Sequence, residues 1–415
     1  MNQGFTPGGA QTLSKQPARF GAAYPGLAMR GAGSQLYCAD GRWYTDWIMG
    51  LAAMPLGYGH PAIDAVALKQ LPLGVSFSLP TALEESVAEQ VCHLVPCAEQ
   101  VRFVKTGSEA TEAAIRVARL ATGRSVVAVC DTHYHGWHSW SAAAKPEHPG
   151  VPWPYAALVR TFRYNDLASV EDALTKQVFE AGPGHAAALI MEPVTFEPPA
   201  PGFLAGVRDL CTRHGALLIF DEMVTGFRWP GASAQAYYGV TPDLACFGKG
   251  LANGWPLACL VGPRSLLRHA WAVSGTFGGE AVSLAAAAVA VELHREPATQ
   301  QLLWETGQRV QRELQALIDD LELPALIEGL PPRLKLTWRH EDANRLMSLW
   351  LQQLVARGVL VHPGGWTGST AHGVSEVAKT TAAAQTAFVA CRHALSTGDW
   401  AALKLPLIEP IQLRG

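Results

Sequence analysis

The sequence predicts an α/β fold with a large sheet domain and a smaller α+β domain. Between about residues 100 and 290, short apolar runs alternate with longer helical patterns, which indicates a parallel sheet covered by helices. The apolar runs are nearly continuous, as in strands that are covered on both faces. After residue 297 the pattern changes to long helices with short strands between them. We therefore expect a large domain at residues 61–296 and a small domain at 297–415, with residues 1–60 packing on the small domain.

Each domain has a series of expected elements. Residues 35–37 and 43–48 form a hairpin pattern around Asp40-Gly41, a dipeptide typical of tight turns. In the large domain we expect strands at 101–104, 125–130, 186–191, 216–220, 244–247 and 258–262, and helices at 109–120, 168–180, 206–214 and 281–294. In the small domain we expect helices at 300–319, 342–356 and 375–394, and strands at 333–338 and 359–361.

Composition excludes several classes of protein. The chain has 415 residues, of which 49% are hydrophobic and 16% charged, so it is not a disordered chain. The net charge is −3 and the basic residues are scattered, which argues against a nucleic-acid partner. Residues 281–293 are too short for a membrane span, and residues 1–16 lack the apolar core of a secretory signal. We expect a cytoplasmic protein with reduced, buried cysteines.

Two charged residues follow predicted strands in a way that suggests chemistry. Asp221 comes directly after the run at 216–220, and Lys249 lies between two glycines after the run at 244–247. Open α/β sheets bind ligands at the carboxyl ends of their strands. A desolvated lysine there is a nucleophile able to form a Schiff base, and pyridoxal phosphate (PLP) needs such a lysine plus a carboxylate at its ring nitrogen. The alternative is a loop lysine and an aspartate that caps a helix.

Two further segments have the character of anion-binding turns. Gly107 and Ser108 follow the strand expected at 101–104 and open the next helix, where backbone N–H groups favour a phosphate. The alternative is that Ser108 only caps that helix. Residues 274–280, which include Thr276, precede the Ala-rich helix and allow the same two interpretations.

Three histidines after the strand at 125–130 suggest a zinc site as one hypothesis. His133, His135 and His138 lie within six positions, and imidazole is a common zinc ligand. However, the neighbouring strand ends supply no cysteine or carboxylate at ligand-like spacing. The interleaved aromatic residues, Tyr134 among them, suit stacking on a planar ring better. We therefore expect no metal.

With these segments in view, the chain resembles the class III PLP-dependent aminotransferases of fold type I, from Pro7 to about residue 395. Residues 218–257 are similar to the family's signature around the cofactor aspartate and lysine. The glutamate-1-semialdehyde aminomutase-like branch is the most similar, through residues 7–15, 76–84, 101–119, 134–138, 192–203 and 275–287. The resemblance implies a mainly parallel sheet of seven strands in the large domain.

The resemblance also implies a role for individual residues. Lys249 would be the Schiff-base lysine and proton shuttle, and Asp221 would contact the pyridine nitrogen. The cofactor site would further contain Gly107 and Ser108 at the phosphate, Thr276 from the other subunit, Tyr134 stacked on the ring, Glu197 near the ring hydroxyl, and His135 and Val224. The family is homodimeric, with active sites at the subunit interface.

Departures from the family pattern bear on the substrate. Semialdehyde aminomutases carry an N-terminal arginine that binds the substrate carboxylate. Here Lys15 stands near that place, and a lysine cannot form the bidentate hydrogen bonds that a guanidinium forms with a carboxylate. Met223 stands where the family usually has Val or Ile. Residues 329–333 are compressed, as in members that act on sugar-like or secondary-metabolite ketones. We expect transamination from an amino donor to a keto or aldehyde acceptor; the alternatives are an intramolecular aminomutase and a binding protein without catalysis.

Overall fold

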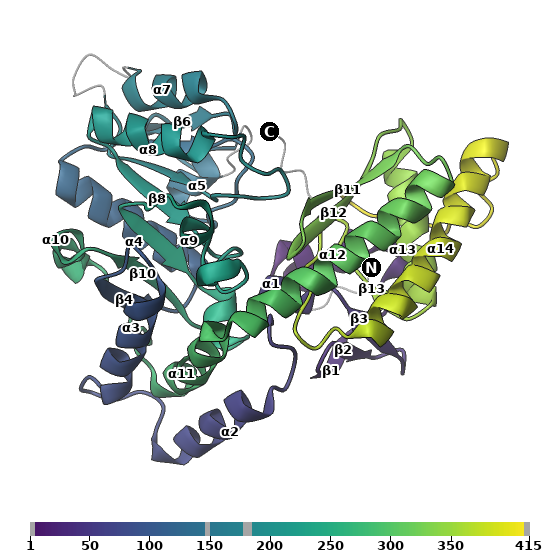
Figure 1. Cartoon of the computed structure of the whole chain (residues 1–415), viewed down its shortest axis with the longest axis horizontal. Coiled ribbons are helices and arrows are strands. Elements are labelled where there is room, and N and C mark those ends of the chain that lie inside the picture. The colour runs from purple at the N-terminus through teal and green to yellow at the C-terminus, as the bar shows by residue number, and fades with distance from the viewer. Residues whose placement is uncertain (1–4, 146–149, 177–184, 411–415) are drawn as a thin grey trace. The chain divides into compact units, whose positions relative to one another are not determined.

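The computed structural model describes residues 5–145, 150–176 and 185–410 (Figure 1). The chain divides into two compact units. One is built from residues 1–60 and 301–412, and the other from residues 61–300.

In its described part, the larger unit is organised around a sheet of seven strands in the order β4-β10-β9-β8-β7-β5-β6. Neighbouring strands from β9 to β6 are parallel, and β10 runs antiparallel to both β4 and β9. This confirms the predicted mainly parallel sheet. In chain order the strands are β4 (Gln100–Val104), β5 (Val127–Cys130), β6 (Val159–Phe162), β7 (Ala188–Met191), β8 (Leu217–Asp221), β9 (Leu244–Phe247) and β10 (Ala258–Gly262).

Helices cover both faces of this sheet, which explains why its strands read as continuous apolar runs (Figure 1). Apolar side chains of α4 (Gly107–Thr122) pack on one face. The other face is buried under α3 (Ala82–Leu94), α7 (Leu167–Thr175), α8 (Phe203–His214) and α11 (Ala281–Arg295). The helix α2 (Pro61–Gln70) packs on α11.

The smaller unit combines two sheets with three long helices. Within its described part, one sheet has the order β1-β2-β3-β13, formed by β1 (Ala28–Ala32), β2 (Gln35–Cys38), β3 (Trp43–Asp46) and β13 (Val359–Leu360). The expected hairpin around Asp40-Gly41 is confirmed, with Gly41 at φ 80°. The second sheet pairs β11 (Ala325–Leu330) with β12 (Arg333–Trp338). The helices are α12 (Pro297–Asp320), which crosses the division between the units, α13 (Ala343–Ala356) and α14 (Val374–Thr397).

The remaining elements are short. The helices are α1 (Met49–Ala52), α5 (Ser139–Ala143), α6 (Trp153–Ala156), α9 (Ala234–Tyr238) and α10 (Arg264–Leu267). Single 3-10 turns occur at Pro7–Gly9, Leu13–Lys15, Pro17–Arg19, Gly21–Ala23, Leu71–Leu73, Pro230–Ala232, Lys249–Ala252 and Arg268–Ala272.

Several boundaries differ from the sequence expectation. The strands β6 and β11 were not anticipated, and α8 begins three residues earlier than expected. The helix expected at residues 168–180 ends at Thr175, and the last four of those positions lie outside the described residues. The helix α12 starts at Pro297 instead of residue 300, because proline fits the first turn of a helix, where its missing N–H is not needed.

The C-terminal tail binds the N-terminal segment. The backbone N–H of Ala22 donates to Pro406, and that of Glu409 donates to Ala18. The buried guanidinium of Arg19 donates to the carbonyls of Glu409 and Pro410. Residues 13–23 and 405–410 therefore stabilise each other within the smaller unit.

The cysteines agree with the sequence prediction, and the helices have a separate property. All eight cysteines lie in the described ranges and are unpaired, and all but Cys92 are buried, as predicted. None of the helices within the described ranges has the length and apolar character that crossing a membrane requires.

The smaller unit contains a histidine that makes its stability depend on pH. His362 is buried; its Nδ1 accepts from the N–H of Gly364, and its Nε2 lies 3.1 Å from the carbonyl oxygen of Ser14. Nδ1 must therefore stay unprotonated. Burial lowers the pKa of His362 from 6.5 to about 4.

We expect this histidine to destabilise the protein in acid. Between pH 6.5 and 4 the unfolded chain binds a proton at His362 that the folded chain does not, so stability falls as the pH falls through this window. The loss is on the order of 2–3 kcal/mol. Urea unfolding of wild type and His362→Gln at pH 7, 6 and 5 measures it, and the variant should show the smaller pH slope. The exposed His93→Gln is the control; equal slopes for all three proteins would contradict the assignment.

Candidate active site

A buried carboxylate–imidazole pair lies at the carboxyl edge of the large sheet. Asp221 is the last residue of β8 and only 2% exposed, and its Oδ2 lies 2.7 Å from Nδ1 of His135, whose side chain is fully buried. Its Oδ1 accepts from the N–H of Met223. No helix begins at Asp221, so the alternative of a helix cap is wrong. The buried Nε2 of His135 has no hydrogen-bond partner among the described residues.

Lys249 follows the neighbouring strand at the same edge. The strands β8 and β9 are parallel, with Asp221 opposite Cys246, so the chain reaches Lys249 three residues further on. Lys249 has φ 45°, a left-handed conformation that is strained for a residue with a side chain. Such strain gathers at functional sites, where the surrounding structure maintains it. The half-buried lysine is thus fixed at the place that the sequence predicted.

The N-terminus of α4 is capped by Thr106 and not by Ser108. The Thr106 hydroxyl accepts from the N–H of Glu109, whose carboxylate accepts from the N–H groups of Thr106 and Lys105 in a capping box. The capping alternative for Ser108 is therefore wrong, and its hydroxyl stays available for another partner. A Cβ on Gly136 (φ 110°) would lie 2.5 Å from Ser108 Oγ, so the loop that carries His135 closes onto this turn.

Met223 lies between the turn at the start of α4 and the end of β9, and it was not among the residues expected at the site. A Cβ on Gly107 would lie 2.9 Å from its sulfur, and one on Gly248 would lie 2.7 Å from it. The thioether thus fills the space between the turn at α4 and the strand end before Lys249. Its position two residues after Asp221 was the only sequence signal. Val224, which the sequence did assign, is also buried.

Two aromatic side chains beside the Asp221–His135 pair are exposed. Tyr134 is 57% and Trp137 is 82% exposed, although both flank buried His135 in the chain. Partial burial, and then the negative charge of Asp221, raise the pKa of Tyr134 above its usual value near 10. An exposed aromatic face next to a buried acid suits stacking on a planar ligand.

The three histidines of this loop have separate partners. His133 accepts from the N–H of Glu192, His135 bonds to Asp221, and His138 contacts the hydroxyl of Thr111. Burial lowers the pKa of His138. The part of the chain that the structure describes contains no group of three or more His, Cys, Asp or Glu able to hold a metal.

Glu222, next to Asp221, has a different environment. Its buried carboxylate accepts from the hydroxyl of Thr225 and from the N–H groups of Ala234 and Gln235 at the start of α9. Burial raises its pKa. Glu222 therefore fixes the loop after β8, and Asp221 alone is placed at the site.

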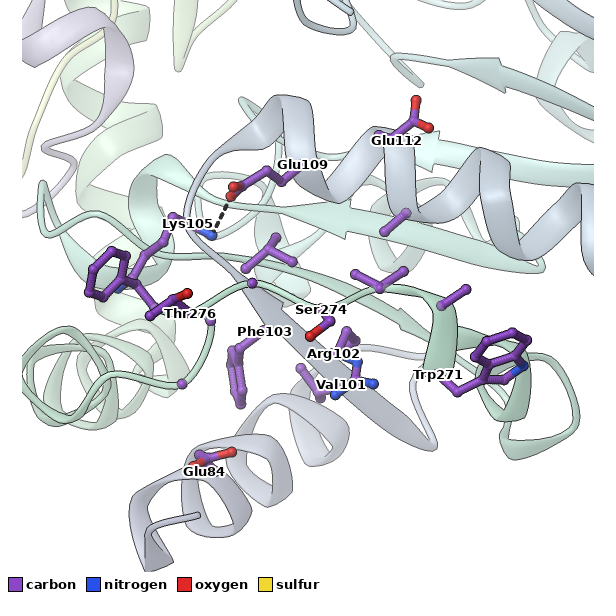
Figure 2. Close-up of a pocket in the computed structure, with 18 of the residues that line it drawn as sticks. Glu84, Val101, Arg102, Phe103, Lys105, Glu109, Glu112, Trp271, Ser274 and Thr276 are labelled. Atoms are coloured by element: carbon purple, nitrogen blue, oxygen red, sulfur yellow. Dashed lines mark hydrogen bonds between the residues drawn. The ribbon is translucent and has the colours of Figure 1, made fainter. Parts of the chain in front are cut away.

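Glu197 and Thr276 are both exposed. Oε1 of Glu197 accepts from the side-chain amide of Asn165. Thr276 lines a cavity of about 610 Å³ with Lys105, Glu109 and the strand β4 (Figure 2). Ser108 is not part of that lining, so the cavity does not bring Thr276 and Ser108 together within this chain.

The mainly parallel seven-stranded sheet with helices on both faces is the fold of the PLP-dependent transferases of fold type I. The chain matches the family model for class-III aminotransferases over residues 21–366. It therefore belongs to the class-III aminotransferase family, as the sequence predicted, and its cofactor is PLP.

Solved structures agree with this assignment. The FumI protein of Sphingopyxis sp. MTA144, in its PLP internal aldimine form, is 29% identical; 89% of this chain and 90% of that chain align with a TM-score of 0.82. An omega-transaminase from Sphaerobacter thermophilus is 26% identical over 94% and 95% of the chains, with a TM-score of 0.85. A glutamate-1-semialdehyde aminomutase from Pseudomonas aeruginosa PAO1 is 24% identical over 90% and 89%, with a TM-score of 0.78, a likeness that concerns the fold alone.

Proposed function

We propose that Lys249 and Asp221 are the catalytic pair with which this aminotransferase moves an amino group from a small amino donor to a keto or aldehyde acceptor. The observation that carries the proposal is the buried Asp221–His135 pair, at the sheet edge where Lys249 also emerges. His135 holds the carboxylate of Asp221 in place through Nδ1, and its Nε2 is buried with no hydrogen-bond partner among the described residues. A carboxylate positioned in this way is suited to bind a polar ring in the site.

The residues present fit PLP. Bound PLP supplies a ring that takes up the charge left when a proton is removed from the substrate carbon. Asp221 would keep the ring nitrogen protonated, and Tyr134 would cover a ring face. The first N–H groups of α4, at Gly107 and Ser108, would hold the phosphate. Further contacts are proposed for His135, Glu197, Val224 and, from a partner subunit, Thr276.

Lys249 would move the proton. Its Nζ is the base that takes a proton from the amine-bearing carbon of the donor and returns one to the carbon that receives the amino group. The fixed backbone of Lys249, in its left-handed turn between two glycines, limits how far Nζ travels.

We also propose a homodimer in the cytoplasm. The segment before α3 exposes six large apolar side chains: Leu68, Leu71, Leu73, Val75, Phe77 and Leu79. So many exposed large apolar side chains in one short segment are unusual on a monomer and typical of an interface. The carbonyl of Val75 accepts from the N–H of Ala281, which ties the segment to the loop that carries Thr276. A second copy of the chain would cover this surface and receive Thr276 at its phosphate site.

Sedimentation velocity of the PLP-loaded protein tests the dimer, and we expect twice the mass of the chain. Phe77→Asp should weaken the dimer, because it introduces a charge into the apolar segment. PLP should then dissociate, because the partner's Thr276 no longer contacts its phosphate. Leu120→Asp, at an exposed apolar position on α4, is the control. A wild-type monomer that retains PLP would contradict the proposal.

The transfer reaction is tested by the visible absorption spectrum of the purified protein. L-glutamate, L-alanine and simple amines are added one at a time, and an effective donor should replace the yellow absorption with that of the amine form of the cofactor. A keto or aldehyde co-product should appear in equal amount. If isomerisation of a single compound proceeds without donor or co-product, the aminomutase alternative is correct. If PLP does not bind, the residue roles proposed above are wrong.

A further inference from the structure

Lys105 lies where β4 turns into α4, and its side chain leaves the turn to contact two other segments. Its Nζ donates to Oε1 of Glu280 at 2.6 Å and to the carbonyl oxygen of Pro256 at 2.8 Å. A third, longer contact of 3.4 Å joins it to the hydroxyl of Ser283. An ammonium has three N–H donors, so this lysine is fully coordinated.

The ion pair is largely shielded from water. The side chains of Lys105 and Glu280 are 17% and 8% exposed. The same carboxylate caps α11, because it accepts from the N–H groups of Val282 and Ser283. Burial raises the pKa of Glu280, but the hydrogen bonds from Lys105 and Ser283 outweigh it and hold the pKa below its usual range. The carboxylate of Glu280 is therefore charged at neutral pH.

Each segment that meets at this ammonium carries one group proposed to contact PLP. Ser108 and Lys249 belong to the site of this chain, and Thr276 belongs to the site of the partner subunit. Ser108 follows Lys105 by three residues at the start of α4. Pro256 belongs to the loop that runs from Lys249 to β10, and Glu280 follows Thr276 by four residues. Figure 2 shows Lys105 and Thr276 at the cavity beside β4. The dashed line in it is the hydrogen bond from the backbone N–H of Lys105 to Glu109 that closes the turn.

We propose that Lys105 is a positioning residue for PLP: by binding Glu280 and Pro256 it holds the segments of Ser108, Lys249 and Thr276 in register, without itself contacting the cofactor. This inference rests on the proposed function, because it assumes the roles given to those three residues. Its charge is already balanced by Glu280, so it acts through geometry and not as a phosphate ligand.

The test compares PLP binding with the stability of the apoprotein. PLP is titrated into apoprotein of wild type, Lys105→Met, Lys105→Arg, Glu280→Gln and the double variant Lys105→Met/Glu280→Gln, with the visible absorption as readout. We expect the Kd for PLP to rise at least tenfold in Lys105→Met and in Glu280→Gln. The double variant should match the single variants, because both changes remove one interaction. Lys105→Arg should stay within about threefold of wild type.

A control separates positioning from the loss of a partly buried ion pair in general. Arg208 pairs with Asp243 at 2.7 Å in the same unit, and Asp243 precedes β9 at the end of the sheet opposite Lys249. Arg208→Met should lower the apoprotein Tm by about as much as Lys105→Met and leave the Kd for PLP unchanged. If Lys105→Met lowers only the Tm, the pair is merely structural and the inference is wrong.

One other outcome would also overturn it. If Glu280→Gln tightens PLP binding while Lys105→Met weakens it, Lys105 acts directly as a positive charge on the phosphate. If Lys105→Met does not fold, Glu280→Gln and Lys105→Arg still decide between a positioning role and a direct contact with the phosphate. Failure of the proposed function is recognised separately: wild type would then bind no PLP, or Lys249→Ala would keep the wild-type PLP spectrum.

Discussion

Lys249→Ala is expected to lower turnover at least a hundredfold. In the proposed function Lys249 is both the amine that binds the cofactor and the base that moves the proton, and general acid–base catalysis alone contributes roughly 10²–10⁴-fold. The fold should survive, because the φ of 45° and the neighbouring glycines belong to the backbone and do not depend on the amine. The rate is measured with the donor that the absorption experiment identifies, and thermal unfolding checks the structure.

Two controls make this result specific to Nζ. Lys69→Ala removes an exposed lysine of the same unit and should retain the wild-type rate. Ethylamine added to Lys249→Ala should restore part of the rate, because a free amine can enter the space that the side chain has left. A Lys249→Ala variant with more than about a hundredth of the wild-type rate would show that another group moves the proton.

The sequence predicted the sheet and its two charged strand ends because these signals are local. Short apolar runs mark buried strands, and a lysine between two glycines directly after such a run stands out on its own. The strand β6 was missed because it lies at the sheet edge and reads Val-Arg-Thr-Phe. Its buried Arg160 donates to the carbonyl of Ala173, a contact that no hydrophobic pattern reports.

The sequence indicated candidate residues for the site but not the contacts between them. The pairing of His135 with Asp221 joins residues 86 positions apart, and no spacing rule connects them. The identity of the α4 cap, in contrast, was visible: Thr106 stands three residues before Glu109, which is the pattern of a capping box. Met223 was undervalued because its role depends on two glycines that come to it from other strand ends.

The pair Asp221 and Glu222 allows a sharp comparison, since both carboxylates are buried and adjacent in the chain. Asp221→Ala should weaken PLP binding and lower turnover about a hundredfold or more, because a preorganised charge at the reacting ring contributes roughly 10²–10³-fold. It also leaves the buried His135 without its partner. Asp221→Asn keeps a side chain of the same shape but loses the charge, so it should retain more PLP than Asp221→Ala and still turn over slowly.

Glu222→Gln provides the matched control. Its carboxylate bonds only to groups of the loop and of α9, so the substitution should lower the Tm and leave the turnover of folded, PLP-loaded enzyme close to wild type. The measurements are the Kd for PLP, the Tm and the initial rate for all three variants. Unchanged PLP binding and turnover in Asp221→Ala would mean that this carboxylate is structural as well, and the catalytic acid would then have to be sought elsewhere on the sheet edge.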